Sequence, residues 1–116
     1  MRKKVKINGT KFGEITINGK PYDSDVTVYW DGKVDYRQKE HVIEATEFVS
    51  VLRADPEIVV IGTGDEGVVR VAPEVNRIAE NKKVKIYAEK TSKAYEIFNA
   101  FAHQRKKVVG IFHVTC

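Results

Sequence analysis

Cysteine is almost absent from this chain of 116 residues, which contains only Cys116. A single cysteine excludes an internal disulfide and is typical of proteins kept in a reducing cytoplasm. Long apolar runs are missing as well, and none approaches the roughly 20 residues that a membrane-spanning helix needs. The basic start, Met1-Arg-Lys-Lys, is not followed by the apolar segment of a secretory signal. We therefore expect a cytoplasmic protein that stays out of the membrane.

A large excess of charge of one sign is also missing, because 20 Lys and Arg residues oppose 16 Asp and Glu residues, for a net charge of +4. Positive charge alone gives only a non-specific affinity for nucleic acid. The paired strand aromatics of RNA-recognition domains are absent, so nucleic-acid binding is the third and least favoured function class. A highly charged surface of mixed sign, with one Met and one Cys, is typical of thermophilic proteins.

The sequence contains no complete set of catalytic or metal-binding residues. There are no paired carboxylates, no Ser-His-Asp set and no phosphate loop with a Lys-Ser/Thr pair. His113 and Cys116 lie close together, but His41 and His103 are remote in the sequence, and structural zinc usually takes four ligands in short paired motifs. We predict neither a metal nor a cofactor, and we interpret His113 as a histidine that packs or bonds locally at a strand end.

The most informative stretch is Ile58 to Ile61, an unbroken β-branched run that is typical of a strand covered on both faces. Gly62-Thr63-Gly64 follows it, where the backbone can turn tightly or approach a ligand closely. In open α/β sheets, ligands bind beyond the carboxyl ends of the strands. The Gly62-Thr63-Gly64 loop is therefore the predicted place for a site.

The first 40 residues predict β-hairpins. Turn-forming pairs occur at Asn8-Gly9, Asn18-Gly19 and Asp31-Gly32, and each is flanked by β-prone residues. If Asp31-Gly32 is a two-residue loop, Tyr29 lies opposite Val34 and Thr27 lies opposite Tyr36.

Beyond the polar connector at 37–41, the pattern alternates between helices and strands. Thr46 is a plausible N-cap of a first helix, Pro73 suits the start of a second, and Thr91 or Ser92 caps a third. Strands are expected at Val84–Tyr87 and Val108–Phe112. The order predicts one α/β domain over residues 1–116, a β-meander followed by α-β-α-β-α-β.

The spacing Gly62-x-Gly64-x-x-Gly67 formally matches a dinucleotide-binding fingerprint. The mechanism also requires a helix that begins at the third glycine, whereas the next helix is expected only at Pro73. Asp65 and Glu66 would place negative charge where phosphate oxygens should lie. A structural turn, or a site for another small anion, fits this loop better.

Two further polar residues remain open to a structural or a binding role. Arg37 suits a carboxylate or phosphate in a cleft, but an exposed arginine or an ion pair with Asp35 is the more common case. Asn99 lies beside the apolar stripe of the third helix and could bond the backbone of a neighbouring loop.

Several short motifs together resemble a known family over essentially the whole chain. They are Phe12-Gly13 with Ile15, Tyr22-x-Ser24-Asp25, Val60-Ile-Gly-Thr-Gly-Asp65, Phe98-Asn99 and Val109-Gly-Ile-Phe-His-Val-Thr-Cys116. The chain resembles small α/β domains of uncharacterised function from archaea and bacteria, whose relatives include a mitochondrial complex I assembly factor and a cytosolic protein associated with adipogenesis.

The resemblance implies a three-layer α/β fold, in which a central mixed sheet is flanked by helices and a small N-terminal β-hairpin element is added. It also implies that the last strand runs antiparallel to the others, whereas spacing alone favours parallel. The family brings no established catalytic residues, and a role in building complex I cannot be carried over.

We therefore expect a non-enzymatic cytoplasmic interaction or assembly-type domain that binds a protein partner of unknown identity. The alternative is a small-anion binder or enzyme that uses the Gly62-Thr63-Gly64 loop and Arg37. The oligomeric state is not predicted. The candidate site residues are Arg37, Gly62, Thr63, Gly64, Asn99, His113 and Cys116.

Overall fold

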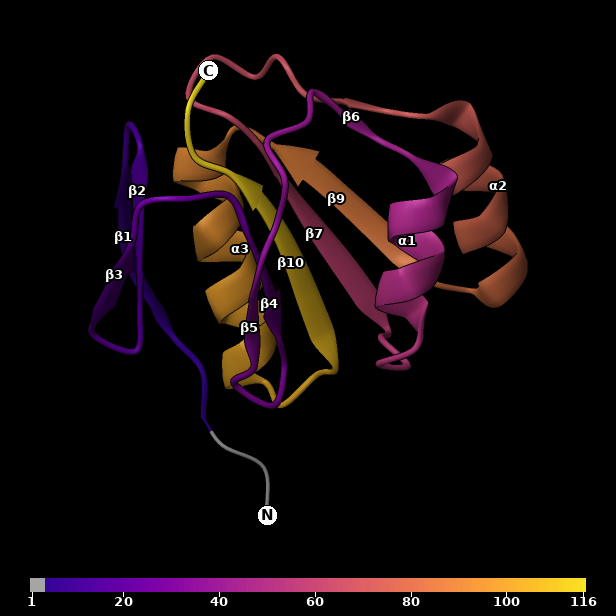
Figure 1. Ribbon diagram of the computed structural model, residues 1–116. Coiled ribbons are helices and arrows are strands. Elements are labelled where there is room, and N and C mark those ends of the chain that lie inside the picture. The colour runs from indigo at the N-terminus through magenta and orange to yellow at the C-terminus, as the bar shows by residue number, and fades with distance from the viewer. Residues whose placement is uncertain (1–3) are drawn as a thin grey trace.

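The computed structural model describes residues 4–116 and contains a central sheet of five strands in the order β5-β4-β10-β7-β9 (Figure 1). β7 (Ile58–Thr63) and β10 (Val108–His113) lie side by side in the middle and run parallel, and β9 (Lys85–Glu89) extends the parallel part at one edge. On the other side, β4 (Val26–Tyr29) is antiparallel to β10, and β5 (Val34–Tyr36) completes the edge. The sheet is therefore mixed, as predicted.

The direction of the last strand corrects the expectation that the family resemblance implied. β10 is antiparallel to β4 but parallel to β7, with Val108 opposite Ile58 and His113 opposite Thr63. The reason is the connection: helix α3 (Thr91–His103) carries the chain from the carboxyl end of β9 back to the amino end of the sheet. Such a crossover joins strands that run in the same direction.

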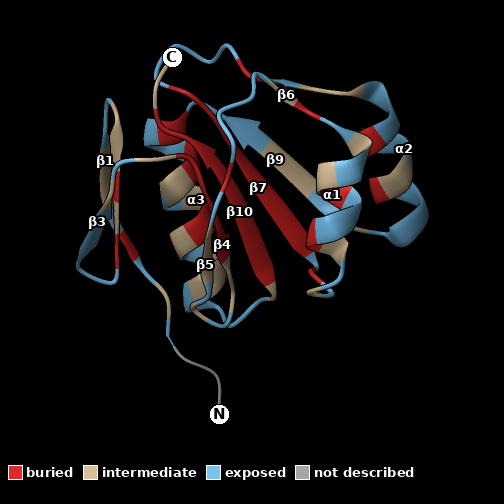
Figure 2. Cartoon of the chain, in the orientation of Figure 1, coloured by how far each residue is buried: buried red, intermediate tan, exposed pale blue. Residues whose placement is uncertain are grey.

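Two helical layers bury the two faces of the central strands. Ile58 and Val60 of β7 pack in the core beneath α3, whereas Val59 and Ile61 pack in the core beneath α1 (Ala45–Leu52) and α2 (Pro73–Lys82). Figure 2 shows β7 and β10 buried along their whole length. Burial on both faces explains why the run from Ile58 to Ile61 contains no polar residue, and the predicted central strand is confirmed.

A second, antiparallel sheet covers the α3 side of the molecule. It consists of β1 (Ile7–Lys11), β2 (Glu14–Ile17) and β3 (Lys20–Tyr22). Asn18-Gly19 forms the two-residue turn between β2 and β3 with φ of 50° and 80°, as predicted. The turn predicted at Asn8-Gly9 is wrong, because this pair lies inside β1 at an irregularity in its pairing with β2.

The hairpin at Asp31-Gly32 exists, but its predicted register is wrong by one residue. Val28 lies opposite Val34 and Thr27 opposite Asp35, because the loop has three residues and Gly32 is left-handed with a φ of 93°. Three-residue loops of this kind are the next commonest hairpin connection after two-residue loops. A shift of one residue moves every side chain of a strand to the other face.

Two of the three helices begin at slightly different residues from those predicted. α2 begins at Pro73 as predicted, whereas α1 begins at Ala45, so Thr46 is not its N-cap. Thr91 is the first residue of α3 rather than its cap.

Two short strands that were not predicted, β6 (Val42–Ile43) and β8 (Arg70–Val71), form a small parallel pair. Within residues 4–116, no helix has both the length and the apolarity to cross a membrane.

Candidate functional site at the carboxyl edge of the sheet

The carboxyl ends of β7 and β10 meet the C-terminal tail at one edge of the sheet, which we call the carboxyl edge (Figure 1). Gly64 lies where the two chain segments come closest and has a φ of 105°. A Cβ atom at this position would overlap the backbone carbonyl of Cys116. Only glycine combines this backbone conformation with so close an approach.

A buried hydroxyl ties the loop to the tail and to α3. Thr91 Oγ1 accepts a hydrogen bond from the backbone N–H of Gly64 at 2.9 Å and donates one to the carbonyl oxygen of His113 at 2.6 Å. Thr63 Oγ1 donates to the carbonyl oxygen of Glu89 at 3.1 Å. The side chain of Thr91 therefore joins three segments.

The next two amides of the loop also bond to the tail. Asp65 N–H donates to the carbonyl oxygen of Thr115 at 2.6 Å, and Glu66 N–H donates to that of Cys116 at 2.8 Å. Gly64 N–H donates to Thr91, so all three backbone amides from Gly64 to Glu66 already donate hydrogen bonds within the protein. The loop does not present the free amides that an anion would need.

Asp25, at the start of β4, is the polar centre of this edge, and its side chain is 2% exposed. One carboxylate oxygen, Oδ2, lies 2.7 Å from Nη1 of Arg37 and 2.7 Å from Nδ1 of His113. The other oxygen accepts the backbone N–H of Val114 at 3.0 Å. A single carboxylate therefore joins β4, the end of β5 and the end of β10.

Arg37 is buried and fully engaged, so the expectation of an exposed residue or of a pair with Asp35 is wrong. Its Nε donates to Glu47 at 2.6 Å, and its Nη1 donates to Asp25 at 2.7 Å. The observed hairpin register explains the pairing, since Arg37 N–H also donates to the carbonyl oxygen of Asp25. The correct loop length would have revealed this pair from the sequence. The guanidinium is not free to hold an anion.

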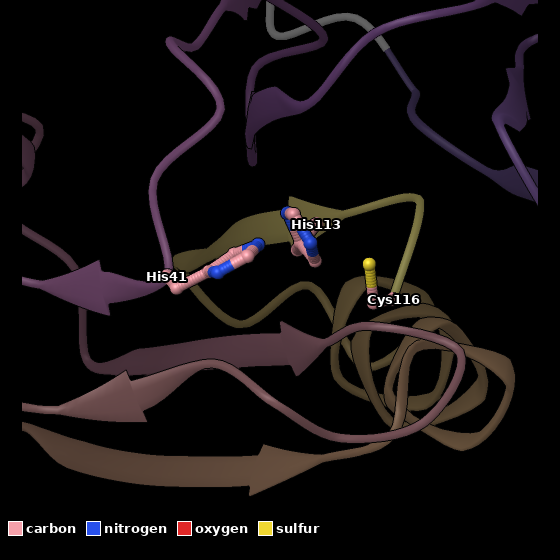
Figure 3. Close-up of side chains that lie close together, drawn as sticks. All are labelled: His41, His113 and Cys116. Carbon is pink, nitrogen blue, oxygen red and sulfur yellow. The ribbon is translucent and has the colours of Figure 1, made fainter.

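Three metal-binding or nucleophilic side chains converge next to this network. His113 is 1% exposed, and the bond between its Nδ1 and Asp25 leaves Nε2 on the other side of the ring. The rings of His41 and His113 pack edge to face with centroids 5.1 Å apart. One ligand atom each from His41, His113 and Cys116 lies within 4.8 Å of the others. Figure 3 shows the three side chains close together. Sequence reasoning missed His41 because its proximity depends on the path of the irregular segment 37–41.

The structure brings all but one of the predicted site residues together at the carboxyl edge. Gly62, Thr63, Gly64, His113 and Cys116 share the carboxyl edge, with Arg37 behind His113. Asn99 lies elsewhere and instead bonds Ile7, accepting from its N–H at 2.9 Å and donating to its carbonyl oxygen at 2.8 Å. Its expected place at this site is wrong, because its side chain fastens β1 to α3.

Large apolar side chains are exposed around the same edge. Phe12, 65% exposed, lies on the β1–β2 turn, which contacts the tail through a bond from Gly13 N–H to the carbonyl oxygen of Val114. Tyr36, 70% exposed, is level with the end of β10 through its pairing with Val26. Val68, 40% exposed, belongs to the loop that bonds to Thr115 and Cys116.

A family model described as "Protein of unknown function (DUF498/DUF598)" matches residues 7–113. The chain belongs to this family. The resemblance to small α/β domains of uncharacterised function is thereby confirmed. The kinship with a complex I assembly factor and with an adipogenesis-associated protein stays a prediction.

Several solved structures have the same fold over almost the whole chain. The conserved hypothetical protein PH1505 of Pyrococcus horikoshii OT3 is 28% identical with a TM-score of 0.86, over 96% of this chain and 99% of that one. A protein named MT938 is 27% identical with a TM-score of 0.82, over 97% and 99%. A Mth938-like domain of Bordetella pertussis is 18% identical with a TM-score of 0.66, over 92% and 84%, and supports the fold alone.

Proposed function

We propose that this member of the DUF498/DUF598 family is a non-enzymatic cytoplasmic interaction domain that binds a protein partner at the carboxyl edge of its sheet. The observation that carries the proposal is the exposure of Phe12, Tyr36 and Val68 on three segments that border this edge. Exposed apolar side chains that cluster mark interaction sites, and aromatic residues are enriched in the buried centres of interfaces.

The polar residues of the edge support a scaffold role. Arg37 donates to Asp25, Asp25 accepts from Val114 of the tail, and Thr91 bonds Gly64 and His113, so these polar groups are all used within the protein. Among residues 4–116, no buried side-chain nitrogen or oxygen lacks a partner. A surface held in this way is already ordered before binding, which lowers the entropy cost of association.

The charges near the edge are of both signs. Asp23, Asp65 and Glu66 are exposed, and so are Lys11 beside Phe12 and Lys90 near Gly67. We infer a partner segment that offers apolar side chains flanked by charged residues. The resemblance to an assembly factor agrees with this class, but its particular complex is not carried over.

Affinity enrichment from native lysate with matched variants tests this proposal. Phe12→Ser and Val68→Ser remove apolar surface at the edge, and Val49→Ser removes a valine of similar exposure from α1 as a control. We expect one protein that the wild-type chain and Val49→Ser enrich and that both edge variants lose. The purified partner should then bind with an affinity at least tenfold lower for each edge variant.

Two results would contradict the proposal. One is enrichment that does not distinguish the edge variants from Val49→Ser. The other is the absence of any reproducible partner together with turnover of a metabolite by the purified chain.

A second candidate function, binding of a small anion, is favoured by a cavity at the opposite end of the sheet. The cavity has a volume of about 470 Å³, and Lys6, His103 and Arg105 line it together with Trp30 and Ala102. Two cationic side chains, Lys6 and Arg105, beside apolar ones suit an anionic ligand with an apolar part. This location replaces the Gly62-Thr63-Gly64 loop, whose amide donors are engaged.

A thermal-shift panel of phosphates, nucleotides and carboxylates tests the second candidate. A ligand at 100 times its dissociation constant adds about 2.7 kcal/mol of stability. The shift should disappear in Arg105→Gln and persist in Arg77→Gln, which changes an exposed arginine on α2. No shift across the panel would remove this candidate.

A further inference from the structure

We propose that His41, His113 and Cys116 form a binding site for a zinc-like divalent cation at the carboxyl edge. Their ligand atoms lie within 4.8 Å of one another and come from the segment after β5, the end of β10 and the tail (Figure 3). Two imidazole nitrogens and one thiolate are a ligand set that suits zinc and its neighbours, not magnesium or calcium.

His113 is already oriented as a ligand. Its Nδ1 bonds to the carboxylate of Asp25 at 2.7 Å, so the neutral ring carries its proton there and has its lone pair on Nε2. Nε2 lies 3.3 Å from Thr115 Oγ1, whose hydroxyl can donate to it. A carboxylate behind a histidine is the usual second layer of zinc sites, because it fixes the ring and raises its basicity.

The other two ligands are free to adjust. Zinc bonds of about 2.0–2.3 Å imply ligand atoms about 3.3–3.8 Å apart in a tetrahedron. His41 is exposed and Cys116 is half-buried, so we expect their side chains to rotate toward His113 when an ion binds. A solvent molecule or Thr115 completes the coordination.

Binding of the cation releases a proton from Cys116 and links two segments of the chain. The Cys116 thiol loses its proton to solvent and the thiolate bonds to the metal, so one proton is released from this group for each ion. Affinity therefore falls as the pH is lowered. The bound ion joins the segment 37–41 to the tail, independently of any protein partner.

Cobalt and zinc titrations of the untagged full chain test the site. Cobalt should bind with one ion per chain and give the intense thiolate-to-cobalt charge-transfer absorption, which Cys116→Ser abolishes. His41→Ala should weaken zinc binding at least tenfold, whereas His103→Ala, which removes an exposed histidine on α3, should leave it unchanged.

Alkylation of Cys116, the single cysteine of the chain, gives an independent readout. Saturating zinc should slow alkylation of the wild-type chain and of His103→Ala, but not that of His41→Ala. The proposal is overturned if zinc binds equally well to His41→Ala and Cys116→Ser, or if bound cobalt lacks the thiolate band. It is equally overturned if neither ion binds the folded wild-type chain at micromolar concentration.

Discussion

At the scale of single residues, Asp25 joins three segments of the carboxyl edge, although it was not among the predicted site residues. Its carboxylate accepts hydrogen bonds from Arg37, His113 and the backbone of Val114, and almost none of it reaches solvent. Removing one partner of a buried charge network leaves the other charges uncompensated, which costs far more than the loss of a surface ion pair.

We therefore predict that Asp25→Ala lowers the free energy of unfolding by about 3–5 kcal/mol, as breaking a buried ion pair does. Asp23→Ala removes an exposed carboxylate two positions away and should change stability by no more than about 0.5 kcal/mol. Urea unfolding followed by circular dichroism measures both. Equal losses in the two variants would show that the Asp25 network does not stabilise the fold.

Tyr29 gives a prediction about alkaline pH. Burial raises the pKa of its phenol above the usual value of 10.0, and the negative charges of Asp35, Asp31 and Glu47 raise it further. The unfolded chain therefore loses this proton first as the pH rises. The contribution of Tyr29 to stability is complete below about pH 10 and is lost above it.

We expect the free energy of unfolding of the wild-type chain to fall more steeply above about pH 10 than that of Tyr29→Phe. Denaturant titrations at a series of alkaline pH values measure the difference. Parallel curves for the two chains would contradict the raised pKa. Ultraviolet titration of the folded chain should show one fewer late-ionising phenol in the variant.

Residues that follow buried strands could be placed from the sequence, whereas residues whose positions depend on loops could not. Gly64, His113 and Cys116 could be placed together because residues that follow buried strands meet at one sheet edge. Asp25 and His41 could not, because their positions depend on a hairpin register and on an irregular connector. The third loop residue sets the register that places Arg37 opposite Asp25, whereas a two-residue loop would place it opposite Val26.

At the scale of elements, the N-terminal sheet is fastened to α3 through one amide side chain. Asn99 bonds both the N–H and the carbonyl oxygen of Ile7, which is buried. We predict that Asn99→Ala costs about 1–3 kcal/mol, because two backbone groups lose their partner. Asn76→Ala, on the exposed side of α2, is the matched control.

Hydrogen exchange localises this effect. The amide of Ile7 should exchange faster in Asn99→Ala, while amides of β7 change only with global stability. Unchanged protection of Ile7 would mean that the bonds to Asn99 do not hold β1 in place.

The contact between the β7 loop and the tail depends on Gly64. An added methyl group would overlap the backbone of Cys116, and the φ of 105° disfavours any other residue. We predict a loss of at least about 1–3 kcal/mol for Gly64→Ala from backbone strain alone. Gly9→Ala, in β1 with open space around it, should be close to neutral. Thermal unfolding of the two variants compares them, and equal melting temperatures would contradict the close approach.

Elements with a strong pattern could be predicted and short ones could not. The buried runs at Ile58–Ile61 and Val108–Phe112 and the proline at the start of α2 each carry a physical signal of their own. β6 and β8 have two residues each and exist only because they pair with each other. Val68, Val69 and Val71 favour a strand around β8, but no sequence pattern indicates that it pairs with β6.

At the scale of the whole molecule, the two ends of the sheet differ in character. Exposed apolar residues and the His41, His113 and Cys116 cluster lie at the carboxyl edge. The opposite end carries the cationic cavity lined by Lys6 and Arg105. The three-layer arrangement followed from the family resemblance, whereas the direction of β10 was decided by the α3 crossover, which the order of elements alone favoured.

Site-specific photocrosslinking in native lysate tests most directly whether the carboxyl edge is the binding surface. A photoreactive amino acid replaces Val68 at this edge in one chain and Val49 on α1 in another. We predict that the probe at position 68 crosslinks the same protein that affinity enrichment captures, and that the probe at position 49 does not. Equal crosslinking from both positions, or crosslinking from position 49 alone, would contradict the account.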